Sequence, residues 1–145
     1  MHDLPRKLSA SELAELFQGP SRFVEVLAEA EDPLGRARAV LDDLSEAERV
    51  EALNAHPRIG EQGLTGRSAS EQGAEDDPAL TKVLARLNKA YEERFGFRFV
   101  VFVDRRPKAE IVPVLRDRLQ RTRAEELATG CDELVAIGLD RWRSR

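Results

Sequence analysis

The chain has 145 residues, of which 41% are hydrophobic and 34% charged, and a net charge of −4 at pH 7, which is typical of one soluble globular domain over residues 1–145. No apolar run approaches the roughly 18 residues of a membrane-spanning helix, so the composition excludes a membrane partner. The mildly negative charge, without a Lys/Arg block interleaved with aromatic residues, argues against nucleic acid as a partner.

The first half of the chain has the apolar spacing of amphipathic helices, with hydrophobic residues three and four positions apart. Ser-x-x-Glu capping boxes that begin at Ser9 and Ser45 mark the starts of two helices. Ser21 can cap another, and Pro33 suits the opening turn of a fourth. We therefore expect helices that begin near residues 9, 21, 33 and 45, and the last one must end near residue 56 because a proline follows.

The second half of the chain predicts three further helices. They cover residues from about 77 or 78 to 95, residues 108–121 and residues 123–143. Pro113 weakens the middle helix unless it lies within the opening turn, where amide groups are free. Residues 95–103, FGFRFVVFV, are strand-like but have no second strand to pair with, so we expect a buried extended connector or a short helix. The predicted fold is therefore all-α, with about seven helices.

His56 is the only internal histidine, and it lies where a predicted helix ends beside a glycine-containing loop. An unperturbed imidazole pKa near 6.5 makes histidine the most versatile acid or base at neutral pH, and a helix exit leaves it within reach of a ligand. The structural alternative is a histidine that caps carbonyls at the end of a helix. Position alone does not decide between the two.

Glu71 ends a further capping box, which begins at Ser68, and this pattern alone indicates a structural role. Fifteen residues and three glycines separate Glu71 from His56, which is enough chain to fold the carboxylate back beside the imidazole. The same motif can therefore cap a helix and hold a catalytic histidine.

Arg118 continues the apolar stripe of Ile111, Val114 and Leu115 at helical spacing, so its guanidinium is expected to point toward the core. A cation that points inward needs an anionic partner. That partner is either a protein carboxylate or an anionic ligand held by the planar fork of arginine.

Metal and disulfide chemistry are not indicated. Cys131 is the single cysteine, which excludes an internal disulfide, and two histidines with one cysteine do not make a zinc site. The first ten residues lack the apolar region of a signal peptide and the last five carry no lipidation or peroxisomal signal, which predicts a cytoplasmic protein.

Four motifs occur together and in one order: HPRIGE, SASEQ, LNKAYEERFGFRFVVF and LRDRLQ. This combination resembles the 2-oxo-4-hydroxy-4-carboxy-5-ureidoimidazoline (OHCU) decarboxylase family, over nearly the whole chain from Ser9 to Trp142. The resemblance implies an all-helical homodimer that acts late in urate degradation without a cofactor. Its substrate would be an anionic ureidoimidazoline, which loses carbon dioxide to give (S)-allantoin.

By match of motif, the resemblance implies that His56 and Glu71 are catalytic and that Arg118 holds the substrate. It also implies a set of residues that line the site or cover the heterocycle: Pro57, Ser68, Gln72, Phe97, Val100 and Val101. The chain departs from the family pattern in two places. Arg98 stands where the family often has proline, and Arg121 stands where it often has asparagine.

The implied reaction agrees with the residues present. Loss of carbon dioxide beside an imine or carbonyl leaves electrons that the heterocycle can delocalise, so the reaction requires no pyridoxal, thiamine or metal. From the residues, two other functions remain open. One is a non-catalytic helical interaction module, in which SASEQ only caps, Arg118 pairs internally and FGFRFVVF docks a partner. The other is hydrolysis of a ureido compound by water that the His-Glu pair activates, which is disfavoured without a metal.

Overall fold

The computed structural model describes residues 4–60 and 77–144. Within these residues it contains seven helices and no strand, which confirms the predicted all-α fold. The helices are α1 (Ala10–Phe17), α2 (Arg22–Glu29), α3 (Pro33–Asp43), α4 (Glu46–Asn54), α6 (Pro78–Phe95), α7 (Lys108–Arg118) and α8 (Arg123–Arg143). None of them combines the length and the apolar character that crossing a bilayer requires.

The helix starts follow from local side-chain chemistry. Both predicted capping boxes in the first half are present, because the hydroxyls of Ser9 and Ser45 each accept a hydrogen bond from the amide of the glutamate three residues later. Those glutamates in turn accept from the serine amides. A third box, between Thr122 and Glu125, starts α8 and was not singled out from the sequence.

Two helices differ in detail from the expectation. The α7 helix ends at Arg118 rather than near residue 121, because the amides of Gln120 and Arg121 turn back to carbonyls only three positions earlier. Pro113 lies beyond the opening turn of α7, at an exposed position, and the helix continues through it. At the start of α3, Asp32 makes no side-chain cap and has a positive φ of 53°, so the helix start relies on Pro33 in the first turn.

Residues 97–103, hereafter the connector, join α6 to α7 without forming a helix or a strand. The first of the two alternatives for this stretch, a buried extended connector, is therefore confirmed. An extended segment without a partner strand must find other partners for its backbone. Side chains supply them: the Arg98 amide donates to Oδ1 of Asn54 at 3.0 Å, and the Phe102 amide donates to Oε1 of Glu133 at 3.3 Å.

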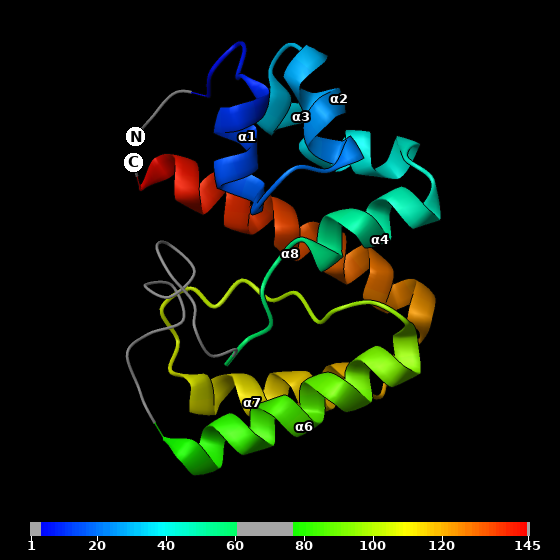
Figure 1. The fold of residues 1–145 in the computed structure, drawn as a ribbon, viewed down its shortest axis with the longest axis vertical. Coiled ribbons are helices and arrows are strands. Elements are labelled where there is room, and N and C mark those ends of the chain that lie inside the picture. The colour runs from blue at the N-terminus through cyan, green and yellow to red at the C-terminus, as the bar shows by residue number, and fades with distance from the viewer. Residues whose placement is uncertain (1–3, 61–76, 145) are drawn as a thin grey trace.

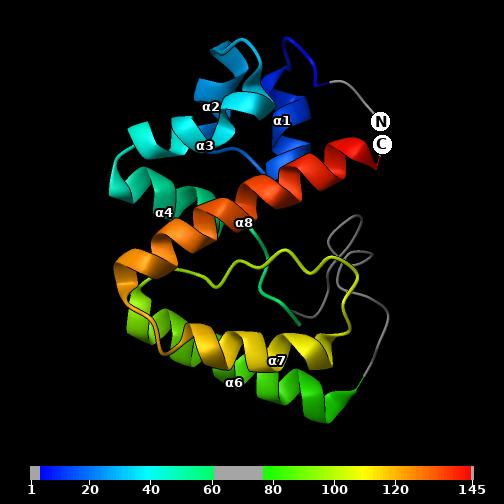
Figure 2. The same cartoon turned by 180° about the vertical axis from the view of Figure 1, so that it is seen from behind.

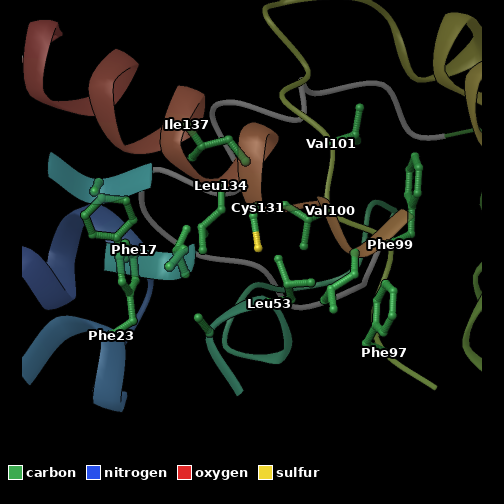
Figure 3. Packing of buried hydrophobic residues seen from close by; sticks show 14 of the residues in the cluster. Phe17, Phe23, Leu53, Phe97, Phe99, Val100, Val101, Cys131, Leu134 and Ile137 are labelled. Carbon is green, nitrogen blue, oxygen red and sulfur yellow. The ribbon is translucent and has the colours of Figure 1, made fainter. Parts of the chain in front are cut away.

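The helices form two groups on either side of the connector (Figure 1). Helices α1 to α4 pack against one another, and α1, α3 and α4 pack against the long α8, while α6 and α7 lie side by side. The view from behind shows the same arrangement, with the connector and residues 56–60 crossing between the two groups (Figure 2). One hydrophobic core extends through the seven helices and the connector of the described chain, and Figure 3 shows part of it. The chain leaving α4 is thus enclosed between the groups.

Two buried glycines let α8 approach its neighbours. A Cβ at Gly138 would lie only 2.6 Å from Cζ of Phe17, whose ring packs edge-on against Phe23 with centroids 4.9 Å apart. A Cβ at Gly130 would lie 3.1 Å from Cδ1 of Leu53, which is the end of a flexible side chain. The contact with α1 is therefore the tighter of the two.

Gly138→Ala is expected to lower the free energy of unfolding by about 1–3 kcal/mol, because overpacking against a fixed ring exceeds the gain of roughly 1 kcal/mol in helix propensity. The matched variant Gly130→Ala is expected to change it by less than about 1 kcal/mol, since Leu53 can shift. Urea unfolding followed by circular dichroism measures both. Equal stabilities of the two variants would contradict the close approach of α8 to α1.

Candidate active site

The predicted site residues fall into two groups. Those that the structure describes are His56, Pro57, Phe97, Val100, Val101 and Arg118. The others, Ser68, Glu71 and Gln72, lie outside the described residues, together with the capping box predicted for them.

His56 lies two residues beyond the end of α4, as predicted, and its side chain is only 5% exposed. Its amide donates to the carbonyl of Leu53 at 3.2 Å, so the last turn of the helix fixes the backbone here. Nε2 of the imidazole is buried and has no hydrogen-bond partner within the described part of the chain. Burial, followed by the positive charge of Arg141, lowers the pKa of His56 to about 3. The imidazole is therefore neutral at pH 7.

Arg141 is a buried cation that acts on His56, and the sequence analysis did not include it among the candidate site residues. It lies in the last turn of α8, is 2% exposed, and acts electrostatically on His56. Its Nη1 donates to the carbonyl of Leu16 and to Oε1 of Gln18, each at 3.1 Å, so the end of α1 orients the guanidinium. The signal was present in the sequence, because Arg141 follows Leu134 by seven positions on the buried face of α8, as Arg118 follows its own apolar stripe.

Arg118 points inward and is 5% exposed, as predicted. Of the two alternatives for its partner, the structure contains the protein carboxylate: Nε donates to Oε1 of Glu126 at 2.7 Å. Nη1 donates to the carbonyl of Val100 at 2.8 Å, and the guanidinium lies 4.5 Å from the ring centroid of Phe99. Its buried Nη2 has no hydrogen-bond partner among residues 4–60 and 77–144.

Glu126 is fully buried and accepts several hydrogen bonds beside Arg118. Besides Arg118, it accepts from the Tyr91 hydroxyl at 2.6 Å and from Nη1 of Arg121 at 2.9 Å. Burial, and then the hydrogen bond to Glu126, raise the pKa of Tyr91 above its usual range, so the hydroxyl stays protonated and donates. Arg121 also donates to the Thr129 hydroxyl at 2.8 Å, which fixes the end of α7 at this departure from the family pattern.

The connector contributes the residues that were predicted to cover a heterocycle. Phe97, Val100 and Val101 are all buried, at 2%, 3% and 7% exposure. Phe97 packs edge-on against Tyr91 with centroids 6.1 Å apart. Because the Val100 carbonyl accepts from Arg118, the network around Glu126 holds this stretch of backbone in place.

This arrangement is suited to proton transfer with an anion. A buried cation attracts an anionic ligand, and the charge of that ligand favours the protonated form of a nearby imidazole. A neutral imidazole whose Nε2 has no hydrogen-bond partner in the described part of the chain can accept a proton as the anion binds. Within the described residues, no group of three or more His, Cys, Asp and Glu is placed to hold a metal ion.

Comparison with known proteins gives related sequences over most of the chain. The 2-oxo-4-hydroxy-4-carboxy-5-ureidoimidazoline decarboxylase of Haloferax volcanii is 33% identical over 106 residues, which are 69% of this chain and 62% of that protein. The decarboxylase of the same name from Halalkalicoccus jeotgali is 31% identical over 112 residues, 73% of this chain and 64% of that protein. The match thus spans less than two thirds of the length of these two relatives.

A solved structure has the same fold. The crystal structure of an OHCU decarboxylase in the presence of (S)-allantoin superimposes with a TM-score of 0.75 at 25% identity, and the match covers 88% of this chain and 92% of that one. The model of the OHCU decarboxylase family matches residues 3–143. The chain therefore belongs to the OHCU decarboxylase family.

Proposed function

We propose that the chain is a single decarboxylase domain, residues 1–145, that converts 2-oxo-4-hydroxy-4-carboxy-5-ureidoimidazoline to (S)-allantoin in urate degradation. The observation that carries this proposal is the buried, neutral His56, whose Nε2 has no hydrogen-bond partner in the described residues and which lies within the field of Arg141. Membership of the family supplies the substrate class. The cytoplasmic location and the homodimer stay predictions.

The reaction needs a proton acceptor and a proton donor on one face of the ring. The carbon–carbon bond to the carboxylate breaks, carbon dioxide leaves, and the electron pair moves into the heterocycle, so the ring acts as its own electron sink. A proton must then reach the carbanionic carbon from one side only. Neutral His56 can take the hydroxyl proton of the substrate, and the imidazolium so formed can return a proton to carbon.

The remaining residues have roles that follow from charge and position. We expect Glu71 to orient the imidazole and to raise its pKa in the complex, with Pro57, Ser68 and Gln72 lining the site. We expect Arg141, whose charge acts on His56, to hold the substrate carboxylate.

Arg118 stays a predicted substrate-binding residue. The support for its role is its buried Nη2 and its bond to the Val100 carbonyl, within the stretch that contains Phe97 and Val101 and is predicted to cover the ring. Its pairing with Glu126 is also one of the features that the non-catalytic alternative requires. That alternative gives no reason for burying an imidazole nitrogen without a described partner.

Activity is tested with freshly generated substrate, by carbon dioxide release and by circular dichroism of the allantoin formed. His56→Asn is expected to lower kcat at least about a hundredfold, the low end for a positioned acid–base group, while the far-ultraviolet spectrum stays that of the wild type. A folded variant with wild-type turnover would remove His56 from the mechanism. A wild-type protein that releases no carbon dioxide would overturn the proposed function.

Arg141→Lys is expected to lower kcat/KM about 10- to 100-fold, because lysine keeps the charge but loses the two-pronged donor that matches a carboxylate. The control is Arg143→Lys, since Arg143 is exposed in the same last turn of α8. Isothermal titration with (S)-allantoin gives a second measurement. Equal kinetics and equal affinity in the two variants would remove Arg141 from the site.

The lowered pKa of His56 is expected to make the stability of the protein depend on pH. Its pKa is about 3 in the folded protein and near 6.5 in the unfolded chain, so between these values the unfolded chain binds more protons. The free energy of unfolding is therefore expected to fall by about 1.4 kcal/mol per unit as pH drops from 6.5 toward 3, and to be independent of this group above 6.5. Urea unfolding of wild type and His56→Asn at a series of pH values isolates this contribution. Parallel curves for the two proteins would contradict the buried, neutral imidazole.

A further inference from the structure

Two hydrogen bonds join the end of α4 to the connector in a reciprocal way. The Arg98 amide donates to Oδ1 of Asn54 at 3.0 Å, and Nη1 of Arg98 donates to the carbonyl of His56 at 2.8 Å. In each bond, a side chain of one segment holds the main chain of the other. The two segments are more than forty residues apart in sequence, so neither bond follows from local structure.

The second of these bonds completes the fixing of the His56 backbone. The His56 amide already donates to Leu53, but a helix end leaves its last carbonyls without intrahelical donors. The next residue is Pro57, which cannot contribute an amide to the turn. The guanidinium of Arg98 supplies the donor instead, so both the N–H and the C=O of His56 are engaged.

Arg98 is placed for this contact by the extended connector. Side chains alternate along an extended segment, and Phe97 and Phe99 on either side are both buried at 2% exposure. Arg98 is therefore directed away from them, and with Asn54 and Phe97 it lines a pocket of about 290 Å³. The Arg98 side chain thus connects the residue predicted to cover the substrate with the residue predicted to transfer the proton.

We propose that Arg98 is a positioning residue for His56, which acts through the His56 carbonyl and fixes the imidazole relative to Phe97 and the rest of the connector. This inference rests on the proposed function, in which His56 transfers the proton. It concerns geometry rather than charge, because the pKa of His56 is lowered by burial and by Arg141.

The chain offers an unusually direct measurement, because it contains two histidines. In a His2→Gln background, His56 gives the only imidazole signals in a nuclear magnetic resonance spectrum, and its environment can be followed without activity. Arg98→Met keeps the length of the stem and removes the donor, whereas Arg98→Lys keeps a donor. The control is Arg106→Met, because Arg106 is also partly buried and donates to the carbonyls of Val103 and Phe102.

Arg98→Met is expected to shift the His56 imidazole signals. It is also expected to lower kcat about 10- to 100-fold while KM changes by less than about threefold, because misplacement of a catalytic group affects mainly the chemical step. Arg98→Lys is expected to recover most of both properties. Arg106→Met is expected to leave both at wild-type values. Unchanged imidazole signals or wild-type kcat in Arg98→Met would overturn the inference, as would an equal loss of kcat in Arg106→Met.

Two further measurements distinguish a wrong inference from a variant that does not fold and from a wrong proposed function. If Arg98→Met does not fold, Asn54→Ala removes the partner bond from an exposed position at the end of α4, and its expected effects have the same direction. Unchanged signals and kcat in Asn54→Ala then overturn the inference. A wild-type protein without decarboxylase activity overturns the proposed function, and the catalytic part of this inference falls with it. The imidazole signals still decide whether Arg98 positions His56.

Discussion

The buried carboxylate of Glu126 is the constraint on which the α6–α7 side of the structure depends. An ionised carboxylate taken out of water costs several kcal/mol unless donors surround it. The donors come from α6, from α7 and from the turn before α8, as Tyr91, Arg118 and Arg121. These elements can move only together, and the bond from Arg118 to the Val100 carbonyl extends the constraint to the connector.

A second buried charge, Arg141, lies at the opposite end of α8. Glu126 and Arg141 lie in the first and last turns of α8, which places them about 22 Å apart along the helix axis. Glu126 accepts hydrogen bonds from two arginines and a hydroxyl. Arg141 donates to oxygens at the end of α1 and acts electrostatically on His56. The α8 helix thus carries at one end a buried carboxylate that is linked to the connector through Arg118, and at the other end a buried guanidinium that acts on His56. The position of each depends on how α8 packs.

Much of the fold could be predicted because helix starts are local. Capping serines and prolines act within one turn, so the sequence predicts where most helices begin. The sequence does not decide whether Arg118 pairs with a protein carboxylate or with a ligand. Glu126 lies in the first turn of a helix, where acidic residues are common. Arg141 does not stand out in the sequence either, because a cation in the last turn of a helix is commonplace. The contact of Arg98 with His56 depends on tertiary packing alone, and the family motifs give no indication of it.

Backbone amides of the connector are hydrogen-bonded to side chains rather than to a neighbouring strand, and this changes how those hydrogen bonds break. In a ladder, each bond is supported by the next, so amides become accessible only when a whole pair of strands separates. Here the amides of Arg98 and Phe102 depend on single side-chain oxygens of Asn54 and Glu133. A rotamer change of Asn54 or Glu133 is enough to break the bond. These amides should therefore exchange with solvent deuterium through local fluctuations, whose free energy is far below that of global unfolding. The rate of exchange along the connector therefore reports on how often the wall of the candidate site loosens while the helices stay intact.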